Sequence, residues 1–224
     1  MKNKKIRLII GGIILSGILI TAIAISSSSK ETKVSDVKVI NPIKEIVKNT
    51  LDSEYNIMTD WKTRNGDKFI ENKELLALYN KENDFKAKLY EKVNLKIEDF
   101  KSDIEVEEVY KTNKDTYLAY VLYGNSFYEK RNSKTLSESR NEPYIFEIKN
   151  NNGSFTINKM IDMSDDLDLY EKSKSKTKIT EEIFKDYDKR LEEESNNIDK
   201  FNKNIDKYAK EIISNGNKEI NINK

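Results

Sequence analysis

The chain has 224 residues, a formal net charge of +1, and neither Cys nor His. The absence of His removes the commonest general base and excludes Ser-His-Asp and Cys-His arrangements and zinc sites that use His. Lys2, Lys4, Lys5 and Arg7 carry four of the positive charges, so the rest of the chain has a net charge of about −3. Such a balance argues against a nucleic-acid partner. We therefore expect no catalytic residue, no cofactor, no metal ion and no nucleic acid.

An uncharged apolar run begins at Leu8 and ends at Ile25. A helix of this length spans roughly 27 Å, which is close to the hydrocarbon thickness of a bilayer. The basic leader, residues 1–7, keeps the N-terminus in the cytoplasm by the positive-inside rule. The run therefore predicts a signal-anchor, a retained single transmembrane helix that places the rest of the chain outside the cell membrane.

A cleaved signal peptide is the alternative. Ala22 and Ala24 form a small-x-small pattern, and cleavage near Ala24 would give a secreted protein. The apolar run is longer than the usual hydrophobic region of about 7–15 residues, which favours the anchor. No Cys follows the run, which excludes a lipoprotein.

Residues 26–40 are polar and predict a linker before an exported domain over residues 41–171. Asn41 and Pro42 favour a helix start, and Gly66 is a plausible terminator. We interpret Trp61, the only Trp, as a packing residue at the end of the apolar stripe. The stripe has helical spacing and comprises Ile43, Ile46, Val47, Leu51, Met58 and Trp61.

Two shorter amphipathic helices are expected next, over residues 72–79 and 84–100. Asn72 and Asp84 are reasonable N-caps for them. Residues 94–99 could instead be extended.

From Asp103 to Tyr110 the apolar period changes to two, as in a half-buried strand. Residues 116–123 are apolar on both faces, which is typical of a central strand covered on both sides. The sequence NNNG at residues 150–153 is a strong hairpin signal between two further strands. An antiparallel meander of at least four strands follows from this pattern.

Gly124 and Asn125 allow two interpretations. They could form a two-residue hairpin turn, or a bulge in one strand that continues to about Arg131. We favour the bulge, with a polar loop over residues 132–141 leading to the next strand at Pro143.

The acidic segment 162–168 lacks the central Gly and the closing Glu of a calcium loop, so we interpret it as a solvated turn. Residues 172–178 predict a charged hinge, and Thr180 caps a coiled-coil-like helix over residues 179–216 that ends at Gly216. This helix either packs back on its own domain or serves a partner or a second copy.

These elements predict an α+β fold, with N-terminal helices packed on a curved, cone-like antiparallel sheet of four or more strands. A transmembrane helix precedes this domain and a long C-terminal helix follows it. Over about residues 41–163 this order resembles the nuclear-transport-factor-2-like fold. A single anchor before such a domain is similar to the envelope subunits of conjugation and type IV secretion systems. The resemblance rests on element order, so it implies a place in the envelope and no functional residues.

The sequence favours a non-enzymatic scaffold or assembly subunit of a bacterial envelope machine, with protein partners or self-association. A surface-displayed module that binds a ligand or peptide in the concave face of the sheet is the alternative. An enzyme with paired carboxylates would use Glu105, Glu107 or Glu108, but alternating charge on a solvated strand explains them better. The candidate partner surface comprises Tyr117, Tyr123, Tyr187, Leu191, Ile198, Phe201, Ile205, Tyr208 and Ile212.

Overall fold

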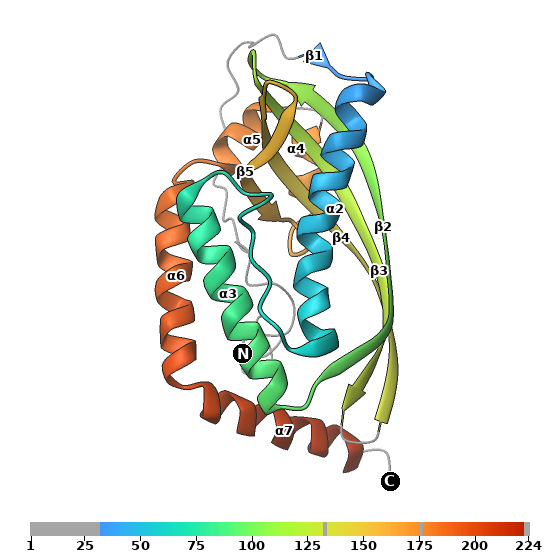
Figure 1. Cartoon of the computed structure of the whole chain (residues 1–224), viewed down its shortest axis with the longest axis vertical. Helices are drawn as coiled ribbons and strands as arrows, with labels where there is room; N and C mark the ends of the chain where they lie inside the picture. The colour runs from blue at the N-terminus through green and yellow to red at the C-terminus, as the bar shows by residue number, and fades with distance from the viewer. Residues whose placement is uncertain (1–31, 132–133, 175–176, 222–224) are drawn as a thin grey trace.

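The computed structural model describes residues 32–131, 134–174 and 177–221. It shows an α+β arrangement in which β1 to β5 form one antiparallel sheet in sequence order (Figure 1). The elements are β1 (Thr32–Lys33), α2 (Val37–Asp60), α3 (Lys73–Lys92), β2 (Lys96–Lys111), β3 (Thr116–Arg131), β4 (Lys134–Asn151), β5 (Ser154–Asp162), α4 (Leu167–Lys174), α5 (Thr177–Ile183), α6 (Tyr187–Lys203) and α7 (Ile205–Asn221). The predicted fold class, α+β with N-terminal helices on an antiparallel sheet, is confirmed at this level.

The predicted transmembrane run, residues 8–25, lies outside the described residues. Within residues 32–131, 134–174 and 177–221, no helix combines the length and the apolar character that a membrane crossing requires.

Helices cover both faces of the central strand β3, as its doubly apolar sequence predicts. On one face, the Tyr123 hydroxyl donates to Asp52 Oδ1 of α2 at 2.8 Å. On the other, the Tyr120 hydroxyl donates to the Ser173 carbonyl of α4 at 3.0 Å. Helix α3 packs on α2, and α6 packs on α3 (Figure 1).

Helix α2 begins at Val37, four residues before the expected start at Asn41. Asp36 is the true N-cap, because its side chain accepts from the Lys38 N–H at 2.9 Å. Pro42 lies in the second turn of the helix, where it removes only the bond to the Lys38 carbonyl. The predicted linker therefore ends earlier than residue 40, since β1 and the first turn of α2 occupy part of it.

Helix α2 ends at Asp60, well before Gly66. Trp61 caps it in the left-handed conformation, with φ of 60°, and its indole N–H donates to the Leu95 carbonyl at 2.7 Å. Gly66 has a different role. A Cβ there would lie 2.8 Å from Ile70 Cδ1 and 2.9 Å from Tyr79 Cδ1, so Gly lets the loop approach α3 closely.

One helix, α3, replaces the two expected helices. Asn72 is its N-cap, as predicted, and accepts from the Leu75 N–H at 3.0 Å. Asp84 lies inside the helix, so the predicted cap there is wrong. Strand β2 begins at Lys96, which favours the extended alternative for residues 94–99 over a helix that runs to residue 100.

Strand β3 runs unbroken to Arg131, and the hairpin alternative at Gly124 is excluded. The expected bulge at Gly124 is also wrong, because Gly124 pairs in register with both Asp103 and Asn141. The irregularities lie in β2 instead. One falls between Glu98 and Lys101, where Asp99 has φ of 52°.

The β3–β4 connection is tighter than expected. Arg131 pairs directly with Lys134, so most of the predicted loop over residues 132–141 is strand β4. The β4–β5 hairpin confirms the NNNG signal, since Asn152 and Gly153 have φ of 56° and 96°, as this kind of two-residue turn requires.

Residues 163–166 form a turn, and Ser164 and Asp165 are exposed in it, as the solvated-turn interpretation predicts. The interpretation does not hold for the ends of the acidic segment, because Asp162 is a half-buried residue of β5 and Leu167 begins α4. Asp162 Oδ1 accepts from the Ser164 N–H at 2.8 Å, and Asp166 Oδ1 accepts from the Leu169 N–H at 3.0 Å at the start of α4.

The predicted single C-terminal helix is three helices, α5, α6 and α7. Asp186, with φ of 55°, separates α5 from α6, and Asn204 separates α6 from α7. Helix α7 continues past Gly216 to Asn221, so the predicted end is wrong. The apolar spacing persists through these breaks because each helix packs on the same domain, α6 and α7 on α3 and α5 beside α4.

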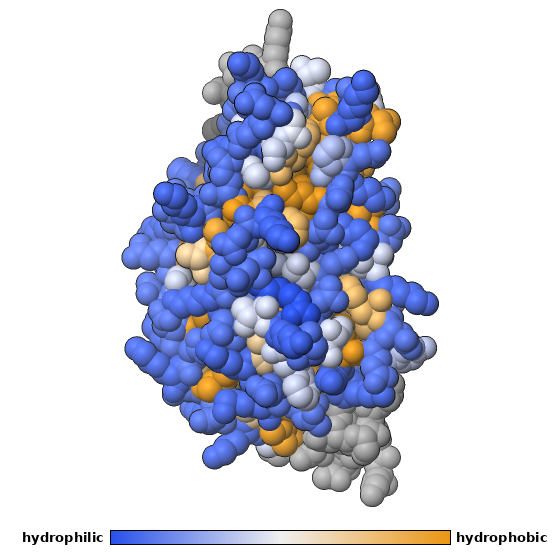
Figure 2. Space-filling model, viewed as in Figure 1, coloured by the Kyte–Doolittle hydropathy of each residue, from blue (hydrophilic) through white to orange (hydrophobic). Residues whose placement is uncertain are grey.

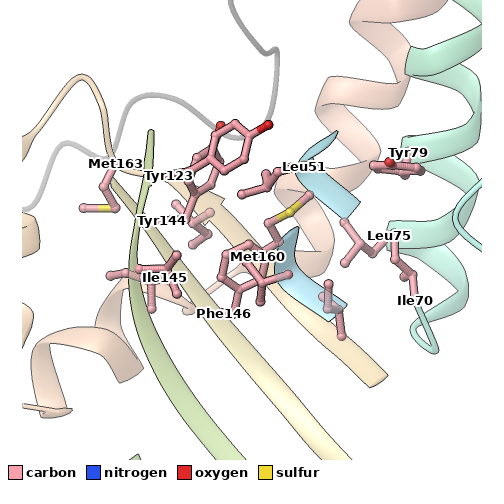
Figure 3. Packing of buried hydrophobic residues seen from close by; sticks show 14 of the residues in the cluster. Leu51, Ile70, Leu75, Tyr79, Tyr123, Tyr144, Ile145, Phe146, Met160 and Met163 are labelled. Atoms are coloured by element: carbon pink, nitrogen blue, oxygen red, sulfur yellow. The ribbon is translucent and has the colours of Figure 1, made fainter. Parts of the chain in front are cut away.

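Hydrophilic residues cover most of the face of the molecule shown in Figure 2. The core lies between the helices and the sheet, where Leu51 of α2, Leu75 of α3, and Phe146 and Met160 of the sheet lie in one layer (Figure 3). Phe146 and Met160 are fully buried. The space between α2 and the sheet is therefore filled by side chains at these positions.

Candidate functional site

A pocket of about 20 Å³ lies between α2, α3 and β4. A water molecule needs roughly 10–15 Å³ of such space, whereas sites for metabolites and cofactors are on the order of 300–1,000 Å³. This pocket therefore has room for about one water. It is lined by Glu54, Tyr55, Met58, Lys86, Tyr90, Glu142 and Tyr144.

Regular spacing brings these side chains together. Glu54 and Met58 are one turn apart on α2, as are Lys86 and Tyr90 on α3, so each pair shares a helix face. Glu142 and Tyr144 lie on the same face of β4, as residues two apart in a strand do.

Lys86 is a buried cation between two carboxylates. Its Nζ lies 2.9 Å from Glu54 Oε2 and 2.7 Å from Glu82 Oε1, and its side chain is only 4% exposed. Burial acts to lower the pKa of Lys86, but the charges of Glu54 and Glu82 outweigh it and raise that pKa well above its usual value. Lys86 therefore stays protonated and holds α2 and α3 together.

Glu54 is the member of this cluster whose hydrogen bonding is incomplete. Its Oε1 is buried and has no hydrogen-bond partner among the described residues. Burial raises the pKa of Glu54 to about 7, and nearby Glu82 adds to this, while Lys86 acts in the opposite direction. Burial therefore favours the protonated form of Glu54 more than it would be favoured in an exposed carboxyl group.

A second carboxylate, Glu142, accepts hydrogen bonds from two tyrosines and, at 3.5 Å, from the Asn125 side chain. The Tyr55 hydroxyl lies 2.9 Å from each Glu142 oxygen, and Tyr144 contributes a longer contact of 3.4 Å. Burial and then the charge of Glu142 raise the pKa of Tyr55 far above its usual range, so Tyr55 remains a neutral donor. Arg140 lies 3.9 Å from Glu142 and partly balances its charge.

The pocket offers space for about one water beside the carboxyl groups of Glu54 and Glu142. Across residues 32–131, 134–174 and 177–221, no group of three or more acidic side chains is placed to hold a metal ion. The ion pairs and hydrogen bonds around this pocket join α2 to α3 and to β4. We expect them to contribute to the stability of the fold.

The carboxylates considered for catalysis lie away from this pocket. Glu107 accepts from the Tyr170 hydroxyl at 2.7 Å and pairs with Lys174 of α4 at 3.1 Å. Glu108 pairs with Lys33 of β1 at 2.8 Å, and Glu105 is exposed on β2. The contacts of Glu107 and Glu108 join β2 to its neighbouring elements.

The predicted partner-surface residues lie in the interior or partly in it. This matches the alternative in which the C-terminal stripe packs on its own domain, because α6 and α7 lie on α3. Six of these side chains are buried and three half-buried. The buried ones are Tyr117, Tyr123, Tyr187, Leu191, Ile198 and Ile212, and the half-buried ones are Phe201, Ile205 and Tyr208.

Sequence reasoning missed the Glu54–Lys86–Glu82 cluster, although a signal was present. Glu54 falls on the apolar stripe of α2, one turn from Leu51 and Met58, and Glu82 and Lys86 fall on that of α3. Charged residues in such positions are almost never buried unless they are paired. That signal indicates buried pairing, but it cannot say which residues pair.

The similarity of this chain to known proteins is weak. No protein-family model matches the chain, and no curated protein matches it. Similar solved structures include the intermembrane-space region of the chloroplast protein ARC6, with a TM-score of 0.41 and 10% sequence identity. That match covers 55% of this chain and 95% of the ARC6 region. At this level of similarity nothing about function follows from it.

Proposed function

We propose that the chain is a non-enzymatic, single-pass protein of the bacterial envelope whose exported α+β domain binds protein partners as a scaffold or assembly subunit. The observation that carries the proposal is the basic leader and the uncharged run of residues 8–25, followed closely by a folded domain in which Thr32 is already part of the sheet. Such a run is long enough to span a bilayer, and its basic flank orients it.

The filled interior supports partner binding over ligand binding. Leu51, Tyr123 and Phe146 are at most 1% exposed and occupy the space between α2 and the sheet. The pocket beside them has room for one water only. A module that holds a small ligand in the concave face of the sheet would need this space to be empty.

The finer assignment, to a conjugation or type IV secretion machine, is supported by element order alone. Helices followed by an antiparallel meander behind a single anchor are the features it uses. Genes for a secretion or conjugation ATPase beside the gene for this chain would support the assignment.

Site-specific photo-cross-linking in native membranes tests partner binding. A photoreactive residue would replace Lys207 on α7 or Asn113 in the β2–β3 turn, both of which are exposed. We expect a discrete cross-linked species from at least one position, and none from buried Ile198. A chain that gives no adduct at any exposed position, and that is extracted as a monomer without other envelope proteins, would contradict the proposal.

A further inference from the structure

The chain enters the folded domain at one end of the sheet. Thr32 pairs with Lys111 at the end of β2, and Lys33 pairs with Tyr110. The β2–β3 turn, residues 112–115, follows at once. The β4–β5 hairpin turn lies at the same end, because the Asn150 N–H donates to the Asp115 carbonyl at 2.8 Å. We call this end the entry end, made of β1, the first turn of α2 and these two turns (Figure 1).

Only six residues, 26–31, separate the apolar run from β1. A fully extended chain reaches about 3.3–3.6 Å per residue, so this connection spans at most about 20 Å. Strands β2 and β3 have 16 residues each, which corresponds to a length of about 50 Å. The domain is therefore longer than its connection, and the entry end stays near the bilayer.

Helix α7 lies at the opposite end of the molecule. Lys92, the last residue of α3, pairs with Asp206 of α7 at 2.7 Å. Strand β2 begins just after α3, at Lys96, and runs from there to the entry end. The exposed face of α7 is thus about one strand length away from the point of entry.

The surface of the entry end suits lipid headgroups. Val37 is 61% exposed, and hydrophobic surface is visible near β1 in Figure 2. Lys38 and Lys114 are exposed, and neither forms an ion pair within the described residues. Lysines near a membrane surface are attracted to anionic lipids, whereas the chain beyond its basic leader has a net charge of about −3. Asp36 and Asp115 are also exposed at this end, but their side chains are shorter, and Asp36 caps α2. The longer lysine side chains reach further, so an anionic bilayer favours contact through the ends of Lys38 and Lys114.

We propose that the entry end lies against anionic lipid headgroups on the outer face of the membrane, with Val37, Lys38 and Lys114 as contact residues. The α7 end is then directed away from the bilayer, where it meets protein partners. This inference rests on the proposed function, because it requires residues 8–25 to be the anchor.

Fluorescence quenching in vesicles tests this orientation. The chain has no Cys, so a single introduced thiol is labelled uniquely. Ser35→Cys places the label at the entry end, and Ser214→Cys is a matched, exposed position on α7. The full-length chain would be reconstituted into vesicles of neutral and anionic phospholipids that carry a nitroxide on some headgroups. We expect the label at residue 35 to be quenched several-fold more than the label at residue 214.

Two further arms identify the lipid contact. Replacing both lysines, as Lys38→Gln with Lys114→Gln, should reduce quenching at residue 35, and so should vesicles without anionic lipid. Equal quenching at residues 35 and 214, or stronger quenching at residue 214, would overturn the orientation. Unchanged quenching in both further arms would overturn the role of the lysines and of anionic lipid. Failure of the chain to float with the vesicles would overturn the anchor, and with it the proposed function.

Discussion

The hydroxyl of Tyr187 contacts both backbone groups of Met160. It accepts from the Met160 N–H at 3.0 Å and lies 3.2 Å from the Met160 carbonyl oxygen, to which it donates. Met160 lies on β5, which is the last strand of the sheet. Residues 69–71 cover the same edge nearby, since the Ile157 N–H donates to the Phe69 carbonyl at 2.8 Å. Exposed strand edges promote aggregation, and here a side chain and a loop cover this one.

Tyr187→Phe should therefore destabilise the domain without changing its packing volume. The substitution leaves two buried backbone groups unpaired, which costs about 1–3 kcal/mol. Urea unfolding of the full-length chain in detergent, followed by the fluorescence of the single Trp61, measures the loss. Tyr128→Phe is the matched control because Tyr128 is 46% exposed. Equal effects of the two substitutions would contradict the role of Tyr187.

Lys86→Met should be among the most destabilising single substitutions in α3. It leaves Glu54 and Glu82 buried without their shared cation, and breaking a buried ion pair in this way costs about 3–5 kcal/mol. Lys88→Met removes an exposed lysine two residues along the same helix, where an ion pair contributes at most about 1 kcal/mol. The same urea assay compares them. A loss for Lys86→Met no larger than that for Lys88→Met would show that the cluster does not hold the helices together.

The stability of the domain should decrease as pH rises from about 4.5 to about 7. Burial raises the pKa of Glu54 to about 7 from an ordinary value of 4.5. The unfolded chain therefore loses this proton at a lower pH than the folded chain does, so rising pH favours unfolding. The full effect is on the order of 3 kcal/mol. Burial also raises the pKa of Asp162, to about 6, which acts in the same direction.

Glu54→Gln isolates the contribution of Glu54, because Asp162 is unchanged in that variant. Unfolding midpoints measured between pH 4.5 and 8 should fall less steeply for Glu54→Gln than for the parent chain. Glu45→Gln, which changes an exposed residue of the same helix, should keep the parent slope. Parallel pH curves for all three proteins would exclude Glu54 as the buried titrating group.

Gly66→Ala should destabilise the loop between α2 and α3. The added Cβ would lie 2.8 Å from Ile70 Cδ1 and 2.9 Å from Tyr79 Cδ1, and Tyr79 is almost fully buried. Overpacking of this kind costs about 1–3 kcal/mol. The urea midpoint of the variant measures it, and an unchanged midpoint would show that the neighbouring side chains give way freely.

Local signals in the sequence predicted those parts of the fold that depend on a few adjacent residues. Asn72 caps α3 and Asn152–Gly153 forms a hairpin turn because each feature needs only its own side chain or backbone conformation. The doubly apolar β3 was recognised for the same reason. Its neighbours on both faces could be inferred from its own composition.

The parts that sequence did not predict depend on distant contacts. Asp36 caps α2 in place of Asn41, and both residue types favour that role, so local preference cannot choose between them. The break at Asp186 leaves the apolar spacing intact, so a continuous helix and two packed helices look alike. The Glu54–Lys86 pair joins residues 32 positions apart, and helical periodicity carries no information about such pairing.

Thiol labelling in intact cells tests the central claim that residues 8–25 hold this domain outside the membrane. The Ser214→Cys chain would be exposed to a membrane-impermeant maleimide before lysis, and its membrane fraction would then be washed with carbonate. The account predicts labelling in intact cells and a full-length, labelled chain that stays in the washed membranes. Labelling only after lysis, or a shorter chain that begins near Ile25 in the culture supernatant, would contradict it.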